Sequence, residues 1–152
     1  MRKRFLTILC AGIMLVCAAC GSGKTTDKTT EQAAEIVLNS GDFPLTIQID
    51  DENMLSDTIG LNLNDIAEYT VYQQMLSVDL AELIIIKPKN GKIDAVKDSL
   101  YARKQNLIDT FAFYPNQKEP AEATVVGEKD GLCYLICCND SAKAEEALLK
   151  EI

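Results

Sequence analysis

The chain has 152 residues, a formal net charge of −8 and no histidine. The lack of histidine excludes Ser-His-Asp and Cys-His nucleophile systems and histidine-ligated zinc. Nucleic acid and anionic lipid surfaces are disfavoured as partners, because both need a basic patch and the lysines and arginines are dispersed along this sequence. Carboxylate, lysine or tyrosine chemistry remains open.

The first twenty residues predict export and a lipid anchor. Arg2-Lys3-Arg4 is basic, residues 5–17 are almost entirely apolar, and Ala18-Ala19 directly precede Cys20. This order is typical of a lipoprotein signal peptide covering residues 1–19, which is cleaved so that Cys20 can be acylated. The apolar run is shorter than the roughly 20 residues that a transmembrane helix needs. We therefore expect attachment to the extracytoplasmic face of the cell membrane through lipid on Cys20.

The chain after the predicted cleavage site divides into a tether and one domain. Residues 20–30 comprise the lipidated cysteine and a flexible, polar tether rich in Gly, Thr and Lys. Cleavage removes three basic residues and no acidic ones, so the formal charge falls from −8 to −11. Residues 31–152 are enough for one compact domain with a hydrophobic core and too few for two.

Hydrophobic spacing and turn residues predict an α+β fold with the order α-β-β-α-β-β-α. We expect a four-stranded antiparallel sheet with one long helix across it. The strand at 80–86 is so apolar that it should be central and buried on both faces. The expected elements are a helix at 31–38 with Thr30 as N-cap, strands at 69–72 and 80–86, a helix at 92–114 ended by Pro115, strands at 124–127 and 132–138, and a helix at 141–149. The last two strands are expected to be joined by a hairpin turn at 128–131, because its Asp130-Gly131 pair accepts positive φ.

Glu82 and Arg103 form the most informative pair of charged residues. Glu82 lies in the apolar strand, where a carboxylate buried alone would cost several kcal/mol. Arg103 falls at the edge of the apolar stripe of the long helix and Lys104 inside it. Both cations can extend along the sheet edge into water, or Arg103 can pair with Glu82 near Tyr101 or Tyr114. Such an ion pair is either structural or part of a ligand pocket with Tyr114, and the sequence leaves both open.

Cys133, Cys137 and Cys138 are an odd set of thiols for an exported domain. In a strand, Cys133 and Cys137 would lie on one face about 13 Å apart, too far for a disulfide, and Cys138 would lie on the other face. We interpret them as small buried hydrophobic residues. No metal site is expected, because Asp50-Asp51-Glu52 lacks the glycine and ligand spacing of a calcium loop. No cofactor motif is present.

Several features together resemble an uncharacterised lipoprotein family. They are the lipobox and Thr-rich tether, Ala81-Glu82 and the apolar strand ending in Lys87, Arg103 and Gln105 on the long helix, and residues 111–115. The chain resembles domain-of-unknown-function family 4358, found in Gram-positive, largely anaerobic gut bacteria, over roughly residues 63–139. The resemblance implies attachment to the cell surface and an α+β domain, and it supplies no activity.

Three functions remain open. The favoured one is a non-enzymatic binding or interaction module with a protein partner in the cell envelope. The second is a small-ligand sensor that uses Glu82, Arg103 and Tyr114. The third is a carboxylate-based enzyme, which needs two carboxylates with separated pKa values in a cleft; the sequence nominates no catalytic residue.

Overall fold

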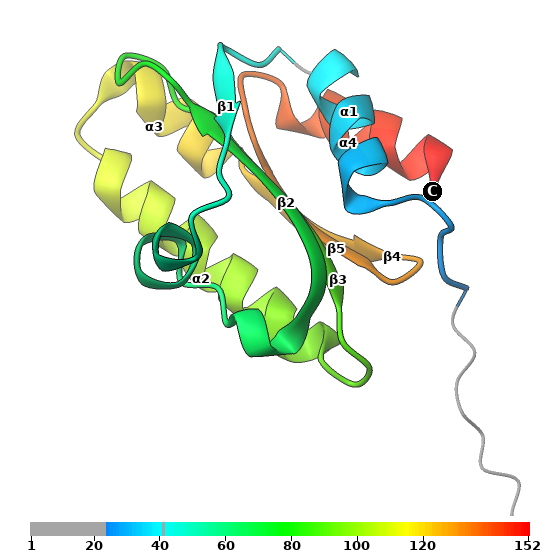
Figure 1. Cartoon of the computed structure of the whole chain (residues 1–152). Helices are drawn as coiled ribbons and strands as arrows, with labels where there is room; N and C mark the ends of the chain where they lie inside the picture. Colours follow the sequence, from blue (N-terminus) through cyan, green and yellow to red (C-terminus); the bar gives the residue numbers. More distant parts are fainter. Residues whose placement is uncertain (1–23, 41) are drawn as a thin grey trace, which may run out of the picture.

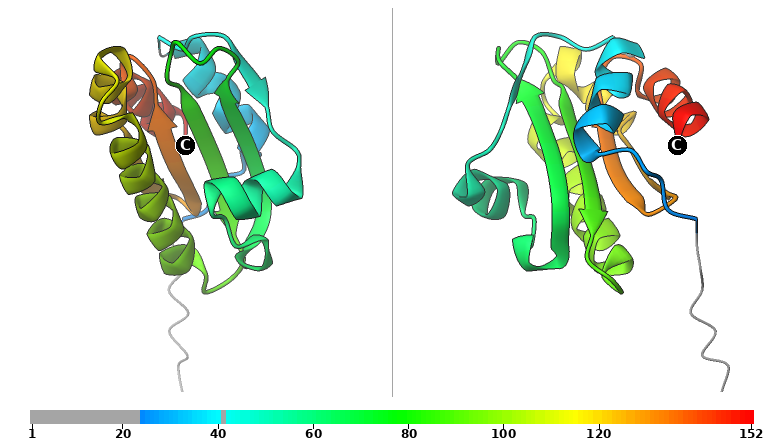
Figure 2. Two further views of the ribbon diagram at one scale, coloured as in Figure 1. Left: turned by 90° about the vertical axis from the view of Figure 1, so that its left-hand side faces the viewer. Right: turned by 45° about the vertical axis from the view of Figure 1, so that its right-hand side comes forward.

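The computed structural model describes residues 24–40 and 42–152, so the predicted signal peptide and Cys20 lie outside the described residues. One antiparallel sheet has the strand order β1-β2-β3-β5-β4, with helices on both faces (Figures 1 and 2). The elements are α1 (Thr30–Ser40), β1 (Thr46–Gln48), the π-helix η1 (Met54–Ile59), the 3-10 helix η2 (Leu63–Asp65), β2 (Ile66–Gln74), β3 (Glu82–Pro88), α2 (Ile93–Phe111), α3 (Pro115–Glu122), β4 (Val125–Lys129), β5 (Leu132–Cys137) and α4 (Ser141–Glu151).

The central strand is β3, which pairs with β2 on one side and β5 on the other. Successive side chains of a strand point to opposite faces. Leu83 and Ile85 lie in one core, and Ile84 and Ile86 lie in the other, all with no exposed surface. This confirms the predicted central strand buried on both faces.

Two hydrophobic cores lie on either side of the sheet. On one face, Val37 of α1 and Leu148 of α4 pack with Leu83 and Ile85 of β3. On the other face, α2 and η1 contribute apolar side chains to a second core, among them Leu100 of α2. The result is three layers, with α1 and α4 on one side of the sheet and α2 and α3 on the other (Figure 2).

The α+β class and the antiparallel sheet are confirmed, but the expected four strands are wrong because there are five. β1 is an edge strand of three residues that pairs with β2. Its residues are half-exposed or exposed on both faces, so no alternation of apolar and polar residues marks it as a strand.

The long helix also ends earlier than the sequence predicts. α2 stops at Phe111, and Pro115 begins the separate helix α3 instead of only ending α2. Proline suits the first position of a helix, where its missing N–H has no intrahelical partner in any case. The chain changes direction between the two helices, in a junction that contains Phe113 and Tyr114.

The hairpin between β4 and β5 forms as predicted. Asp130 and Gly131 have φ angles of 48° and 82°, the left-handed conformation that a two-residue type I′ turn requires at both positions. The adjoining strands pair from Lys129–Leu132 onward.

The sheet has two ends with different contents. At one end, the β4–β5 turn lies beside the start of the described chain, where the Thr26 N–H donates to the Asp130 carbonyl at 2.8 Å. We call this end the base; it comprises residues 24–29, 65–68, 87–94 and 128–131. At the opposite end lie the start of β1, the β2–β3 loop and the α2–α3 junction, which together we call the distal end. In Figure 1 the base lies toward the lower right and the distal end toward the upper left.

Candidate functional site

Arg103 of α2 and Glu82 at the start of β3 form a buried ion pair. Arg103 Nε donates to Glu82 Oε1 at 2.7 Å, and Nη2 donates to Oε2 at 2.6 Å. Glu82 is 1% exposed and Arg103 8%. Two parallel bonds of this kind are the strongest arrangement of an arginine on a carboxylate.

Neighbouring groups complete the hydrogen bonding of this pair. Gln73 of β2 donates to Glu82 Oε2 at 2.7 Å, and Arg103 Nη1 donates to the Thr58 carbonyl at 3.2 Å and to Asn106 Oδ1 at 2.9 Å. Burial alone would lower the pKa of Arg103, but the hydrogen bonds and charge of Glu82 raise it above its ordinary value. The guanidinium is therefore charged, and the hydrogen bonds of the pair join β2, β3, η1 and α2.

The environment of the pair favours a structural role over ligand binding. Neither side chain lines the surface hollows at the distal end, at the base or between α1 and α4. Among the described residues, no buried side-chain nitrogen or oxygen lacks a partner. Lys104, the other candidate cation, is half-buried.

Tyr114, the third predicted site residue, lies apart from the hydrogen bonds of the ion pair. It is 57% exposed and belongs to the distal end. Nine large apolar side chains are exposed in the described part of the chain, and seven of them lie at this end. We call these seven the apolar patch: Leu45, Ile47, Met75, Leu76, Val78, Phe113 and Tyr114.

Hydrogen bonds hold the three segments of the apolar patch together. The Met75 N–H donates to the Leu45 carbonyl at 2.8 Å, which joins the β2–β3 loop to β1. The amide of Gln117, which is 5% exposed, donates to the carbonyls of Ser77 at 2.6 Å and Asp79 at 3.1 Å. These bonds attach the same loop to the start of α3. A hollow of about 400 Å³ lies between the loop and the α2–α3 junction.

Sequence reasoning missed the apolar patch because its members come from three separate segments. A single exposed apolar residue is ordinary, and only the fold brings these seven together. One signal was present: Met75-Leu76 lie in the connection between the expected strands at 69–72 and 80–86, where polar residues are usual.

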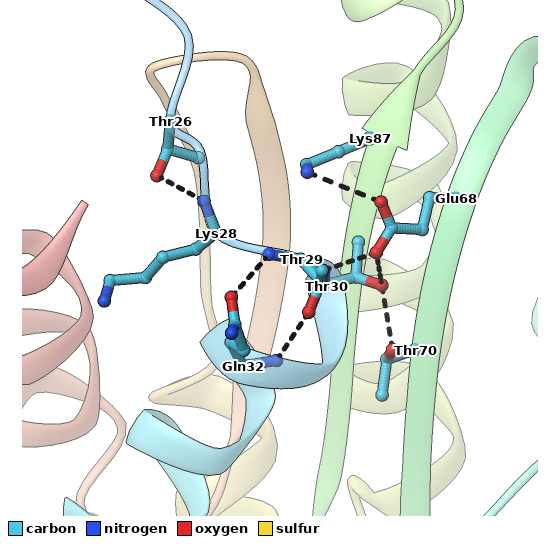
Figure 3. Close-up of polar contacts among 8 residues, drawn as sticks. All are labelled: Thr26, Lys28, Thr29, Thr30, Gln32, Glu68, Thr70 and Lys87. Atoms are coloured by element: carbon cyan, nitrogen blue, oxygen red, sulfur yellow. Dashed lines mark hydrogen bonds and ion pairs between the residues drawn. The ribbon is translucent and has the colours of Figure 1, made fainter.

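The base contains a capping box that fixes the first turn of α1 (Figure 3). The Gln32 N–H donates to Thr29 Oγ1 at 3.1 Å, and the Thr29 N–H donates to Gln32 Oε1 at 3.0 Å. This reciprocal pair satisfies two N–H groups that a helix start leaves without partners. Thr29 is therefore the N-cap, and the prediction of Thr30 in that place is wrong by one residue.

Thr30 instead joins α1 to the sheet (Figure 3). Its N–H donates to Glu68 Oε1 at 2.7 Å, its hydroxyl donates to the same oxygen at 2.9 Å, and it lies 2.9 Å from the Thr70 hydroxyl. Lys87 Nζ lies 3.4 Å from Glu68 Oε2. Partial burial by itself raises the pKa of Glu68, but the Thr30 hydrogen bonds and the Lys87 charge together lower it below its ordinary value.

The three cysteines lie where the strand pattern predicts. Cys133 and Cys137 belong to the core under α2, and Cys138 belongs to the opposite core. All three are buried and free. Burial is the main reason that the pKa of Cys133 and that of Cys137 rise to about 12. At neutral pH these thiols are protonated, which makes them poor nucleophiles and poor metal ligands.

The described residues contain neither a metal-ligand cluster nor a membrane-spanning helix. Within residues 24–40 and 42–152, no three His, Cys, Asp or Glu side chains are grouped so that they could hold a metal ion. No helix in that part of the chain combines the length and apolar character of a membrane span.

Comparison with known families identifies one match. Residues 39–138 match the family model described as Domain of unknown function (DUF4358). No curated protein sequence and no solved structure matches the chain. The matched segment runs from the end of α1 to Cys138, which directly follows β5, and so contains the ion pair and the whole apolar patch. Because it covers more than half of the sequence, the chain belongs to the DUF4358 family.

Proposed function

We propose that this protein is a lipoprotein, anchored through Cys20 to the extracytoplasmic face of the membrane, whose domain is a non-enzymatic module that binds another envelope protein. The apolar patch is the observation that carries this proposal. Contiguous exposed apolar surface on a soluble domain commonly marks an interaction site. The patch lies at the end of the sheet opposite the segment that leads to Cys20, so it would face away from the membrane.

The charges around the patch define the chemistry of the partner. Asp79 directly follows Val78 of the patch in the β2–β3 loop. α3, which begins at the patch, carries Glu119 and Glu122 against a single cation, Lys118, and that cation is 3.8 Å from Glu122. A partner with an apolar centre and a basic rim fits this surface, because opposite charges at an interface rim speed encounter and reject wrong partners.

The form of the surface favours a protein over a small molecule. The patch extends over β1, the β2–β3 loop and the α2–α3 junction, and its side chains are 44–90% exposed. Small-molecule sites instead enclose most of their ligand in a cleft. The aromatic residues Phe113 and Tyr114 are of the kind that contributes most to protein interfaces.

Site-specific crosslinking in the native cells tests the proposal. A photoreactive residue at Val78 or Tyr114 should give one defined protein adduct. The matched control is Tyr101, which is 51% exposed on α2 and outside the patch, and it should give none. Replacing Leu76 with Glu should remove the adduct from Val78. An adduct of equal yield from Tyr101 would contradict the proposed surface.

Two further measurements test the anchor and the alternative of a ligand sensor. Cys20→Ser should move the protein from the membrane fraction to the medium, and retention in the membrane would overturn the lipid anchor. Thermal unfolding in the presence of amino acids, sugars and wall fragments should show no shift. A reproducible rise in melting temperature would instead favour a small-ligand sensor, because a ligand that binds only the folded state must stabilise it.

A further inference from the structure

We infer that the base of the domain is a membrane-contact surface whose hollow binds the headgroup of an anionic phospholipid, a phosphodiester that also carries hydroxyl groups. This inference rests on the proposed anchor at Cys20, and it concerns the opposite end of the molecule from the apolar patch. Position, charge and side-chain chemistry each support it.

The position of the hollow follows from the chain that leads to the anchor. A hollow of about 490 Å³ is lined by the first described residues, Lys24 to Thr26, together with the β3–α2 and β4–β5 turns. Only four residue steps separate Lys24 from Cys20, and four residues span at most about 14 Å. A lipid on Cys20 therefore keeps the hollow close to the phospholipid headgroups.

Lysines that are far apart in the sequence lie together at the base of the folded domain. The four segments of the base hold six of the twelve basic residues that follow the predicted signal: Lys24, Lys28, Lys87, Lys89, Lys92 and Lys129. The same segments hold six carboxylates, so the formal charge of the base is zero: Asp27, Asp65, Glu68, Asp94, Glu128 and Asp130. The formal charge of −11 on the chain after cleavage therefore belongs entirely to the rest of the domain. A negatively charged membrane therefore repels the base less than it repels the rest of the domain taken together. This revises the expectation that anionic lipid is disfavoured.

The side chains in the hollow divide into donors and acceptors. Lys24 and Lys89 have no carboxylate within 4.0 Å among the described residues, and Lys89 Nζ instead donates to the Asn64 carbonyl at 2.8 Å. Glu128 and Asp130 also line the hollow. A phosphodiester with a glycerol headgroup fits this mixed lining, since ammonium groups bind the phosphate and carboxylates accept from hydroxyls. A choline headgroup offers no such donors.

The test uses the chain from Cys20 to Ile152, which contains every helix and strand of the fold. Its Cys20 thiol is coupled to a maleimide lipid in nanodiscs, while the buried thiols of Cys133, Cys137 and Cys138 are protected. The discs contain phosphatidylglycerol or only phosphatidylcholine, with a trace of gadolinium lipid. Relaxation of backbone amide signals then reports which end of the domain meets the membrane.

In phosphatidylglycerol discs we expect strong relaxation at residues 24–26, 87–91 and 128–131 and little at the apolar patch. In the double variant Lys24→Gln, Lys89→Gln, the relaxation should no longer be stronger at the base than at the apolar patch. The apparent affinity of the domain for short-chain phosphatidylglycerol should fall about five-fold per lysine, since each lysine is worth about 1 kcal/mol near an anionic surface. The control Lys143→Gln, Lys150→Gln changes the net charge equally on α4, outside this hollow, and should behave like the unmodified chain.

Equal relaxation at both ends in phosphatidylglycerol discs, or an unchanged pattern in the Lys24, Lys89 variant, would overturn the inference. If the domain binds phosphatidylcholine as tightly as phosphatidylglycerol, the assignment of an anionic glycerol headgroup to the hollow is wrong. Because the anchor is made chemically, these outcomes depend neither on acylation in cells nor on a distal partner. Failure of this inference is therefore distinguishable from failure of the proposed function.

Discussion

The two ends of the sheet are built from opposite chemistry. At the base, two lysines are paired within the domain: Lys92 lies 2.8 Å from Asp65, and Lys87 lies 3.4 Å from Glu68. At the distal end, apolar side chains such as Val78 and Phe113, 67% and 90% exposed, have no apolar cover. Water solvates the base well and the apolar patch poorly. This difference supports the proposal that the distal end contacts a partner, because no other described residues cover its apolar side chains.

Each end of the sheet has a polar connection between elements: Glu82 with Arg103 near the distal end, and Glu68 with Thr30 at the base. The two connections differ in solvent exposure. The pair of Glu82 and Arg103 lies under the β2–β3 loop and is almost fully buried. Glu68 at the base has a side chain that is 38% exposed, so water screens its interactions. Substitutions should therefore have unequal effects on stability at the two ends.

The largest effect is expected from Arg103→Leu. Removing the guanidinium leaves the Glu82 carboxylate buried without its counter-charge, and breaking a buried pair in this way costs about 3–5 kcal/mol of unfolding free energy. Urea denaturation measures the change. The double variant Glu82→Leu, Arg103→Leu should recover most of the loss, and Lys104→Leu is the neighbouring control. A loss below about 1 kcal/mol for Arg103→Leu alone would show that the pair adds little to stability.

A smaller effect is expected from Glu68→Ala at the base. It removes the acceptor of two Thr30 hydrogen bonds and should cost about 1 kcal/mol near neutral pH. Because folding lowers the pKa of Glu68 from 4.5, its contribution is complete above that value and disappears as the pH falls through the lower folded-state pKa. The stability difference from the unmodified chain should therefore be constant from pH 6 to 8 and shrink in acid.

Denaturation at several pH values checks this dependence. Glu35→Ala, at an exposed position on the same helix, controls for the loss of one negative charge. A Glu68→Ala difference that grows as the pH falls would reverse the sign expected for the connection between Glu68 and Thr30.

The smallest effect is expected at the apolar patch. Leu76 is 55% exposed, so Leu76→Ala should change the unfolding free energy by less than about 0.5 kcal/mol. The same substitution at Leu148, which has no exposed surface, should cost about 2–5 kcal/mol. If Leu76→Ala proves as costly as Leu148→Ala, the patch belongs to the core of the domain and is not available to a partner.

Much of the fold could be predicted from local sequence signals. The Asp130-Gly131 turn, the apolar run of β3 and the separation of the three cysteines between two faces depend on neighbouring residues and on strand periodicity. β1 was not predicted, because it is an exposed edge strand of three residues and shows no alternation of buried and exposed side chains. The end of α2 was misplaced because Pro115 fits either after one helix or at the start of the next.

The sequence by itself predicted α1, α2, α4 and four strands, and it offered the pairing of Arg103 with Glu82 as one of two alternatives, because a carboxylate buried alone in an apolar strand is costly. Only the tertiary structure decided that Tyr114 lies away from that pair, that seven apolar side chains meet at the distal end, and that six lysines meet at the base. These groupings join residues far apart in the chain. Their proximity depends on strand order and helix placement, which local periodicity does not encode.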